Sequence, residues 1–489
     1  MEYMELSNYM AQIRRKSKQI EIGFFKSAMA EDSEKNSLQD ILRWLQIKYE
    51  EIKVSVEQIP LNELKLWRFD EQSGSLVHAS GKFFSIEGIR VETNWGQVPK
   101  WEQPIINQPE IGFLGIITKK IDGLLHLLLQ AKIEPGNLNT VQLSPTLQAT
   151  KSNYTKVHQG KSPLFLEFFN GEKNVTVLLD QLQSEQGGRF LRKRNRNIII
   201  EIDESELEQI PDNFIWITLG QLKELIKVDN IVNMDTRTVV SCIPYGSYDT
   251  ATLSFFSALK TFEHSNDKLL HSLLNNELYL NDFDQIISWF TRLKSKYDLK
   301  VTGIPLNRVE SWLNDGVTIH HKEKKYFSII GVNVQIDNRE VVAWDQPMIL
   351  PSQQGMIAFI VKPIQGIYHF LVQAKLEAGN FDILELAPTV QCLTGNYRSG
   401  LNEYSVPFLH EVLTAPENRI WYSALQSEEG GRFYKEQNRN MIIEVGSEFP
   451  VQVPENYCWM TLNQMITLIK FNNYLNIAAR SLISAVAFS

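Results

Sequence analysis

The 489-residue sequence is poor in cysteine, has no long apolar run and carries no excess of basic charge. Its three cysteines, Cys242, Cys392 and Cys458, are odd in number and widely spaced, which indicates neither a disulfide framework nor a zinc site. No stretch reaches the roughly 20 apolar residues that span a bilayer. The N-terminus has early acidic residues, unlike a secretory signal. We therefore expect a soluble, cytoplasmic protein that does not bind membranes.

The charge balance and the glycine pattern exclude further classes of protein. A formal net charge of −8 and a pI near 5.7 argue against nucleic-acid binding, which requires a basic surface. No dinucleotide-binding fingerprint is present, and no His, Cys and Asp grouping predicts a transition-metal site. We expect no nucleic-acid partner, no redox cofactor and no metal.

The chain instead contains a long internal repeat. Residues 126–154 and 369–397 lie 243 positions apart, and 14 of their 29 residues are identical. A duplicated core needs only matching hydrophobicity, because cores accept apolar swaps of similar volume. Many of the shared residues are polar, so we expect that both copies retained a pocket. The shared polar residues include His126/His369, Gln130/Gln373, Lys132/Lys375, Glu134/Glu377, Asn137/Asn380, Gln148/Gln391 and Tyr154/Tyr397.

The repeat extends far beyond this block. LQSEQGGRF at 182–190 matches LQSEEGGRF at 425–433, and NRNIIIE at 195–201 matches NRNMIIE at 438–444. Repeats of about 200 residues are whole domains and not solenoid units, whose periods are about 20–50 residues. We predict an N-terminal arm at 1–36 and a first ligand-binding repeat at 37–245. A helical connector at 246–282 then leads to a second ligand-binding repeat at 283–489.

Hydrophobic periodicity gives the class of each repeat. Helical spacing at 38–53 and 283–297 predicts an amphipathic helix at the start of each copy. The middle of each copy is strand-like, and a second helix follows a threonine suited to N-capping. Each copy therefore has the order helix, mixed sheet, helix, and we expect the fold to consist of two α+β units. The expected strands are 125–134, 197–202, 368–377 and 441–445, and the expected second helices are 218–227 and 461–470.

Several long strings resemble the family of NDP-hexose 2,3-dehydratases. QAKIEPGNLNTVQLSPTLQATKSNYTKVHQG, LQSEQGGRFLRKRNRN and NMDTRTVVSC are similar to its first half, and QAKLEAGN, LAPTVQC, GNY and QSEEGGRF to its second half. This resemblance covers essentially the whole chain. It implies loss of water across carbons 2 and 3 of a dTDP-4-keto-6-deoxyhexose, on the way to 2-deoxysugars. It also implies two modules related to the Nudix fold, a homodimer, and a nucleotide-sugar pocket in each module, one of them vestigial.

The same strings depart from a working Nudix hydrolase. Such an enzyme needs a helix-borne cluster of glutamates that holds divalent cations. Here the Glu-Gly-Gly-like strings are followed by RFLRKRNRN or RFYKEQNRN, without a row of acids. We therefore do not expect metal-dependent hydrolysis, and the dehydration itself requires no redox cofactor.

The dehydration needs a base for the carbon-3 proton, a donor at the keto oxygen and an acid for the carbon-2 hydroxyl. If 125–134 is a strand, His126, Gln130, Lys132 and Glu134 share one face. That face is either a pocket wall or a salt-bridged interior. In a pocket, the lysine would serve the keto oxygen and the glutamate would act as the base.

Two residues of the segment after this strand are further acid or base candidates. Tyr154 and His158 are four residues apart. The tyrosine recurs as Tyr397, whereas His158 falls opposite Leu401, which would mark the first copy as the reacting one. The alternative for His158 is a surface loop. The predicted catalytic residues are thus Lys132, Glu134, Tyr154 and His158.

A cationic string in repeat 1 predicts phosphate binding. Guanidinium groups clamp a diphosphate bidentately, although each single cation in RFLRKRNRN could also lie on a solvated face. Repeat 2 has Glu436 in place of Lys193 and Ala478 in place of Asp235, so we expect repeat 1 to hold the reacting sugar. Completion of a pocket by a partner subunit stays open. The predicted substrate-binding residues are His126, Gln130, Asn137, Gln148, Ser152, Asn153, Arg189, Lys193, Arg194, Asn195, Arg196, Arg237, Lys375, Glu377, Asn380, Tyr397, Arg432 and Arg439.

Two other functions fit the same residues. An isomerase or epimerase acting on a keto-sugar nucleotide would also begin with proton abstraction beside the ketone. A non-catalytic nucleotide-sugar-binding protein would bind without turnover. If the dehydration takes place, its 3,4-diketo product calls for an NADPH-dependent 3-ketoreductase, to which we expect functional coupling.

Overall fold

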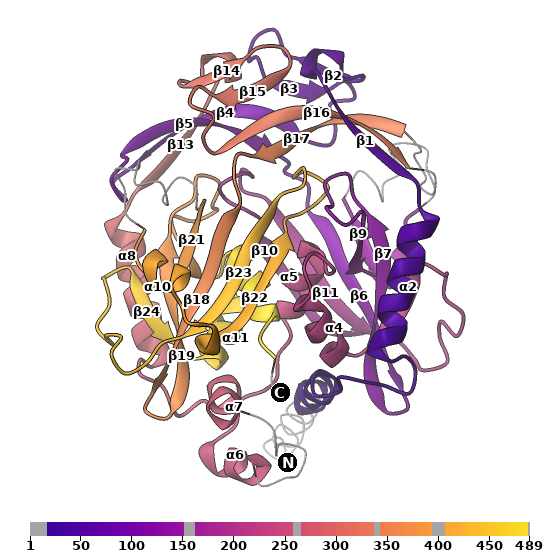
Figure 1. Ribbon diagram of the computed structural model, residues 1–489, viewed down its shortest axis with the longest axis vertical. Coiled ribbons are helices and arrows are strands. Elements are labelled where there is room, and N and C mark those ends of the chain that lie inside the picture. Colours follow the sequence, from indigo (N-terminus) through magenta and orange to yellow (C-terminus); the bar gives the residue numbers. More distant parts are fainter. Residues whose placement is uncertain (1–16, 151–161, 258–265, 337–342, 394–405, 488–489) are drawn as a thin grey trace, which may run out of the picture.

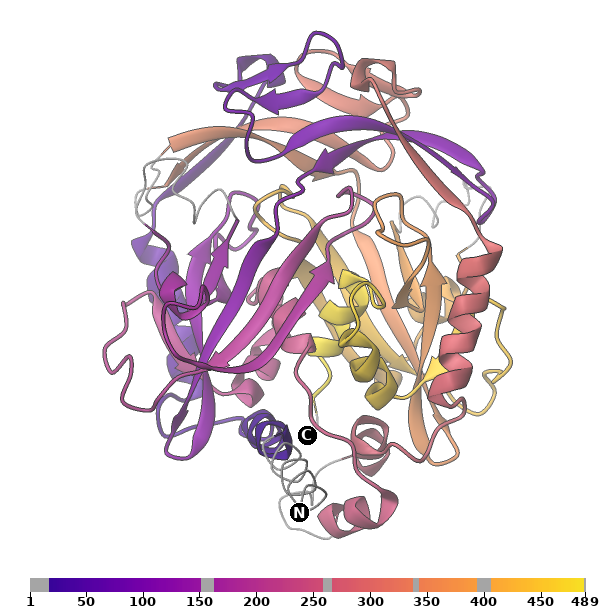
Figure 2. The same cartoon turned by 180° about the vertical axis from the view of Figure 1, so that it is seen from behind.

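The computed structural model of the chain describes residues 17–150, 162–257, 266–336, 343–393 and 406–487. Two halves of the same architecture, one for each repeat, stand side by side beneath a shared layer of strands (Figure 1, and from behind in Figure 2). Strands and helices are mixed in each half, so the predicted α+β class with two repeated units is confirmed. Within the described ranges, no helix is both long and apolar enough to cross a membrane.

Each half is built on a seven-stranded mixed sheet. The first has the order β10-β11-β6-β7-β12, with β8 beside β7 and β9 beside β6. The second repeats this order as β22-β23-β18-β19, with β24 and β20 beside β19 and β21 beside β18. The pairs β11–β6 and β23–β18 are parallel. The strands are β6 (Gly112–Ile121), β7 (Leu124–Ile133), β8 (Val141–Pro145), β9 (Leu147–Ala149), β10 (Thr176–Ser184), β11 (Arg194–Glu201), β12 (Phe214–Ile217), β18 (Gly355–Ile364), β19 (Ile367–Lys375), β20 (Glu385–Pro388), β21 (Val390–Leu393), β22 (Ile420–Ser427), β23 (Gln437–Glu444) and β24 (Tyr457–Met460).

Two pairs of helices fill the space between the large sheets. They are α4 (Leu219–Ile226) and α5 (Met234–Ser241) in the first half, and α11 (Leu462–Ile469) and α12 (Ile477–Ser484) in the second. Thr218 and Thr461 cap α4 and α11 in reciprocal capping boxes, which confirms the predicted threonine-led helices. Helices α5 and α12 pack against each other, so one apolar cluster runs through both halves.

The shared upper layer is made by exchange of strands between the repeats (Figure 1). Strand β1 of repeat 1 pairs with β16 of repeat 2, and β13 of repeat 2 pairs with β4 of repeat 1. Each five-stranded sheet therefore belongs to both repeats, an arrangement that the sequence did not predict. The strands are β1 (Val54–Ile59), β2 (Trp67–Phe69), β3 (Leu76–His78), β4 (Ser85–Thr93), β5 (Lys100–Asn107), β13 (Leu299–Ile304), β14 (Trp312–Asn314), β15 (Thr318–His321), β16 (Phe327–Ile336) and β17 (Ala343–Pro351).

Helices on the outside of each half also correspond. The predicted amphipathic helices are α2 (Leu38–Glu51) and α8 (Phe283–Lys296), which bury one apolar face each. Upstream, residues 17–28 are helical and place the Ser27 hydroxyl on the backbone N–H of Leu219 at 2.9 Å. In the second half, the Ser272 hydroxyl accepts a hydrogen bond from the backbone N–H of Leu462 at 3.0 Å, as Ser27 does from Leu219. The structural repeat thus begins inside the N-terminal arm and the connector. The remaining helices are α6 (Thr250–Ser257), α7 (Asp267–Leu274) and α10 (Leu409–Leu413), with 3-10 turns at Leu61–Glu63, Leu166–Phe168, Leu306–Arg308 and Glu417–Arg419.

Candidate active site

Strand β7 carries its polar side chains toward its C-terminal end. Leu129 and Ile133 lie in the main core, whereas Lys132 projects from the opposite face, as the alternation of a strand requires. Glu134 follows directly after the strand and is only 7% exposed. The expected polar face therefore exists, and it ends in a buried carboxylate.

The Glu134 carboxylate is held by charged and amide donors from its own half. The Lys132 ammonium lies 3.8 Å from Oε1, and the Gln148 amide donates to the same oxygen at 2.8 Å. Gln148 is in turn fixed by Ser144 (2.8 Å) and by Asn233 (3.3 Å), the N-cap of α5. The second oxygen, Oε2, is buried and has no hydrogen-bond partner among the described residues. A buried acceptor of this kind costs free energy unless a ligand meets it.

A glycine loop of the other half packs directly on this carboxylate. The Gly136 N–H donates to the Gly430 carbonyl at 2.7 Å, and the Lys435 N–H donates to the Gly136 carbonyl at 2.9 Å. A Cβ atom on Gly430 would lie 2.2 Å from Asn137 Oδ1 and 2.9 Å from Glu134 Cβ, so a larger residue does not fit. The duplicated Gly-Gly string of one repeat thus closes the pocket region of the other.

This crossing brings Glu429 and Arg432 of repeat 2 to Glu134 of repeat 1. Glu429 Oε1 accepts from the Gly431 N–H at 3.1 Å, and the Arg432 guanidinium lies over the Phe84 ring at 4.1 Å. Burial raises the pKa of Glu429 to about 7, and the nearby Glu134 carboxylate adds to this rise. The Arg432 guanidinium opposes it.

Asp235 adds a third carboxyl group from the first turn of α5. Its side chain is 3% exposed, and no donor among the described residues hydrogen-bonds to its carboxylate. Burial raises the pKa of this carboxyl well above its usual value, and three nearby carboxylates raise it further, namely Glu134, Glu185 and Glu429. We call Lys132, Glu134, Gln148, Asp235, Glu429 and Arg432 the Glu134 cluster.

The pseudo-symmetric position holds a similar but less acidic group. The Gln391 amide donates to Glu377 Oε1 at 3.2 Å, and the Lys375 ammonium donates to the Gln391 carbonyl at 2.9 Å. Burial raises the pKa of Glu377, against the attraction of Lys375 and Arg189. We call Lys375, Glu377, Gln391, Ala478, Gln186 and Arg189 the Glu377 cluster, in which Gln186 and Ala478 stand where the Glu134 cluster has Glu429 and Asp235.

Comparison with known proteins identifies the family. The sequence pattern of the NDP-hexose 2,3-dehydratases matches residues 38–243 and again residues 283–486. The chain belongs to the NDP-hexose 2,3-dehydratase family.

Curated relatives match over nearly their whole length. A dTDP-4-dehydro-6-deoxy-alpha-D-glucopyranose 2,3-dehydratase of Saccharopolyspora spinosa is 47% identical, over 91% of this chain and 90% of the relative. A protein of the same name from Amycolatopsis orientalis is 40% identical, over 94% of this chain and 92% of the relative. The resemblance inferred from the strings is therefore confirmed, and this NDP-hexose 2,3-dehydratase is a hydro-lyase.

The cationic string of repeat 1 is not gathered around Glu134. Lys193 is buried and donates to the Glu110 carbonyl, and burial lowers the pKa of this ammonium to about 8. The Arg194 guanidinium lies over the Phe381 ring at 4.2 Å, in the second half. Arg189 also faces the second half, where it lies over the Phe327 ring at 4.3 Å.

The neighbouring polar residues of these strings bind other protein groups. Arg196 forms two hydrogen bonds with Asp180, at 2.7 and 2.5 Å, on the outer part of the sheet. Asn195 donates to Glu185 Oε1 at 2.7 Å. Arg439 lies on β23 opposite Leu425 and is partly buried. The structure does not bring Arg196 to either cluster.

Arg237 and its counterpart Arg480 join the two halves of this dehydratase. Both are 1% exposed. Arg237 donates to the Gln426 side chain at 2.7 Å and to the Ser427 carbonyl, and Arg480 donates to the Ser184 carbonyl at 2.5 Å. These guanidinium groups hold the strand that leads into the Gly-Gly loop of the opposite repeat.

His126 lies near the start of β7, six residues before Lys132, so the strand separates the two residues by about 20 Å. Its Nδ1 contacts the Leu124 carbonyl at 2.9 Å, and burial lowers the pKa of the ring. Gln130 lies nearer, on the same face as Lys132. Asn137 donates to the Thr140 carbonyl at 3.1 Å and shapes the loop below Gly430.

Asn380 occupies the place of Asn137 in the other half, where a Cβ atom on Gly187 would lie 2.2 Å from its Oδ1. Five predicted residues lie outside the described residues, and their roles stay predictions. They are Ser152, Asn153, Tyr154, His158 and Tyr397.

Sequence reasoning did not select Glu429 or Asp235 as site residues. Both differ between the repeats, as Glu429/Gln186 and Asp235/Ala478. The Asp235/Ala478 difference already favoured repeat 1 as the reacting copy, and the same comparison extended to Glu429/Gln186 would have found the second residue. Among the described residues, no group of three or more His, Cys, Asp or Glu side chains is arranged to hold a metal ion.

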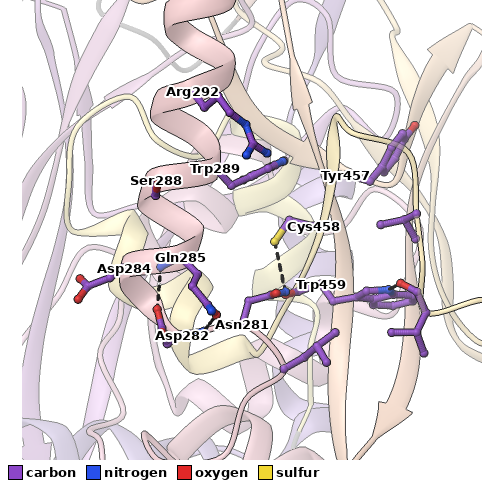
Figure 3. A pocket seen from close by; sticks show the side chains of 13 residues that line it. Asn281, Asp282, Asp284, Gln285, Ser288, Trp289, Arg292, Tyr457, Cys458 and Trp459 are labelled. Carbon is purple, nitrogen blue, oxygen red and sulfur yellow. Dashed lines mark hydrogen bonds between the residues drawn. The ribbon is translucent and has the colours of Figure 1, made fainter.

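A separate cavity of about 660 Å³ lies between α8 and β24 (Figure 3). Trp289, Arg292 and Trp459 are among its lining residues, and no residue of either cluster lines it. Its polar groups largely serve the fold: Asn281 donates to the Trp459 carbonyl at 3.1 Å, and the Trp289 indole donates to the Glu455 carbonyl at 2.8 Å. We therefore place no substrate there.

Proposed function

We propose that this protein removes water across carbons 2 and 3 of a dTDP-4-keto-6-deoxyhexose and releases a 2,6-dideoxy-3,4-diketo sugar nucleotide. The curated relatives carry this type of activity in their names and are matched over nine-tenths of their length. The 4-keto group makes the carbon-3 proton acidic, because its loss gives an enolate. The protein then has to supply a base, an oxyanion donor and an acid.

One observation supports Glu134 as the base. Its Oε2 is buried without a hydrogen-bond partner among the described residues, while Oε1 is held by the Gln148 amide at 2.8 Å and lies 3.8 Å from the Lys132 ammonium. An oriented carboxylate with one free oxygen can take the carbon-3 proton. The adjacent ammonium is then placed to stabilise the charge that develops on the keto oxygen.

The substrate contacts are a further part of the proposal. Arg432 stacks on Phe84 beside Glu134, with Nε buried and without a hydrogen-bond partner among the described residues, and is the cation we assign to the diphosphate of this pocket. Tyr154 and His158 remain candidates for acid or base work. The Glu377 cluster is proposed as a second nucleotide-sugar pocket, with Lys375, Glu377 and Asn380 as its contacts.

The assembly is proposed on the family resemblance. We infer a cytoplasmic homodimer whose two modules, 37–245 and 283–489, are related to the Nudix fold. Its diketo product would pass to an NADPH-dependent 3-ketoreductase. Sedimentation velocity on the purified chain would test the dimer.

The function is tested by product analysis. Purified protein is incubated with dTDP-4-keto-6-deoxyglucose, a 3-ketoreductase of proven activity and NADPH, and the nucleotide sugars are analysed by mass. We expect a 2-deoxy product that is absent when the protein is omitted. Substrate recovered with unchanged mass, in the presence of the active reductase, would contradict the proposal.

A further inference from the structure

Building on the proposed dehydratase function, we propose that Glu429, contributed by repeat 2, donates the proton to the departing carbon-2 hydroxyl in the site that repeat 1 builds around Glu134. The reacting site is then a composite of both repeats, and the Glu377 cluster has Gln186 where this site has its donor.

The first support is convergence of the two carboxyl groups on one point. A Cβ atom built on Gly431 would lie 2.2 Å from Glu429 Oε1 and 3.6 Å from Glu134 Oε1. The two groups come from opposite repeats and meet because the Gly430 carbonyl binds the Gly136 N–H at 2.7 Å. A base and an acid that act on adjacent carbons of one sugar must lie this close together.

The second support is a pair of buried polar atoms that point to a ligand. Glu134 is 93% buried with Oε2 unpartnered, and Gln142 is 99% buried with its Nε2 donor unpartnered among the described residues. Gln142 lies opposite Lys132 in the β7–β8 ladder, so the two side chains share a face. Its other atom, Oε1, accepts from Ser427 at 3.0 Å, next to the Glu429 loop. An acceptor and a donor that both lack a partner among the described residues, each beside Lys132, fit the hydroxyl groups of a sugar.

Charge explains why the two glutamates have different roles. The Glu134 carboxylate has the Lys132 ammonium 3.8 Å from Oε1 and an amide donor on the same oxygen at 2.8 Å. Glu429 is bound by one backbone N–H and is surrounded by carboxylates, and burial with the Glu134 charge raises its pKa to about 7. It therefore keeps a proton near neutral pH, as an acid must.

Exposure separates Glu429 from Asp235. Glu429 is partly exposed and can reach a bound sugar, whereas Asp235 is 3% exposed beneath it. The pKa of Asp235 lies well above its usual value because of burial and the nearby Glu134, Glu185 and Glu429 carboxylates. Asp235 is therefore too deeply buried to act as the donor itself.

The step balances in protons and electrons. Glu134 takes the proton from carbon 3, and the electron pair forms the enolate. The pair then forms the carbon 2–carbon 3 double bond as the carbon 2–oxygen bond breaks, and the oxygen leaves as water with the proton of Glu429. The enol at carbon 3 ketonises to the diketo sugar. A proton transfer from Glu134 to Glu429 restores the starting state, and their closeness makes it short.

The test separates proton abstraction from elimination. Glu429→Gln is compared with Glu134→Gln by following deuterium uptake at carbon 3 in D2O and elimination in the reductase-coupled assay. We expect Glu429→Gln to lower elimination by about 10²–10⁴-fold and to keep deuterium uptake within about fivefold. Glu134→Gln should lose both.

The matched control is Glu385→Gln in the other half. Each substitution installs the residue that the opposite repeat carries at that position, Gln186 for Glu429 and Gln142 for Glu385, so the fold already accepts both. Burial also raises the pKa of Glu385 to about 7, which makes it a comparable buried carboxyl. We expect Glu385→Gln to leave both rates within about threefold. A Glu385→Gln variant that loses elimination while keeping exchange would contradict the assignment.

A pH series on the unmodified protein provides a second measurement, should Glu429→Gln fold poorly. Elimination should fall as pH rises through about 7 while exchange continues, because Glu429 then loses the proton that elimination uses and exchange does not. The charged groups near Glu429 are Glu134, Glu185, Lys132, Lys193, Asp235 and Arg432. An exchange-to-elimination ratio that does not change with pH would contradict the assignment.

The outcomes distinguish the two proposals. An unmodified protein that neither exchanges nor eliminates would overturn the dehydratase function and this assignment together. An active protein whose Glu429→Gln variant eliminates at an undiminished rate, or loses exchange and elimination equally, would overturn the assignment alone.

Discussion

The Glu134 and Glu377 clusters share a frame and differ in their acids. Both keep a lysine, a glutamate and a glutamine on the same strands, and both receive an arginine and a Gly-Gly loop from the opposite repeat. They differ at Glu429/Gln186 and Asp235/Ala478. The shared frame is what both pockets need to form, and the differences indicate which pocket does the chemistry.

The largest expected effect comes from separating the two halves. Strands β1 and β13 pair across the repeats, so residues 1–245 expressed alone would leave β1 without a partner and would expose the edge of β4 that β13 covers. We expect this half to show no cooperative urea unfolding, and co-expression with residues 246–489 to restore it. A half that unfolds cooperatively on its own would show that the exchanged strands are dispensable.

The second comparison sets Glu134→Gln against Glu377→Gln. Loss of the base should lower kcat by about 10²–10⁴-fold, whereas loss of the corresponding carboxylate should lower turnover by less than about tenfold, through weaker binding. Steady-state kinetics in the coupled assay measure both. The opposite order would place the reacting sugar in the Glu377 cluster.

Two glycines test the frame itself. A Cβ atom on Gly430 or on Gly187 would lie 2.2 Å from the facing Asn137 or Asn380 Oδ1. Each Gly→Ala change should destabilise the fold by about 1–3 kcal/mol, the usual cost of overpacking, measured from urea midpoints. Gly430→Ala should also lower kcat more than Gly187→Ala, because it displaces Glu134. Equal kinetic losses would indicate that the two clusters contribute equally.

The smallest effect is the pH dependence of Asp235→Ala, which installs the residue found at Ala478. The pKa of Asp235 is higher in the folded state than in the unfolded state. The contribution of Asp235 to stability therefore falls as the pH rises from the unfolded-state pKa toward the folded-state pKa. The variant should therefore gain stability relative to the unmodified protein between pH 5 and pH 8. Urea midpoints at both pH values measure this, and a constant difference would show that Asp235 does not hold a proton in the fold.

Local structure was largely predictable from the sequence. Helical spacing located α2 and α8, threonine located the starts of α4 and α11, and the polar face of β7 followed from alternation. These features depend on neighbouring residues, which the sequence shows directly.

The pairing of distant segments could not be predicted in the same way. Periodicity does not reveal that β1 pairs with β16, or that the QSEEGG string of repeat 2 lies on Glu134. For this reason the sequence associated the RFLRKRNRN cations with the pocket of their own repeat, whereas Arg189 and Arg194 face the second half. The sequence marked Asp235 as a difference between the copies, but it did not show that Glu429 of repeat 2 lies beside Glu134 of repeat 1.

The pairing of Val56 with Val334 has a consequence during synthesis. The two residues are 278 positions apart (334 − 56). At translation rates of about 5–20 residues per second, the earlier strand waits about 14–56 s on the ribosome before its partner emerges. Throughout that interval its backbone amides have no ladder to join, and cellular chaperones are expected to shield the nascent chain until the second half arrives.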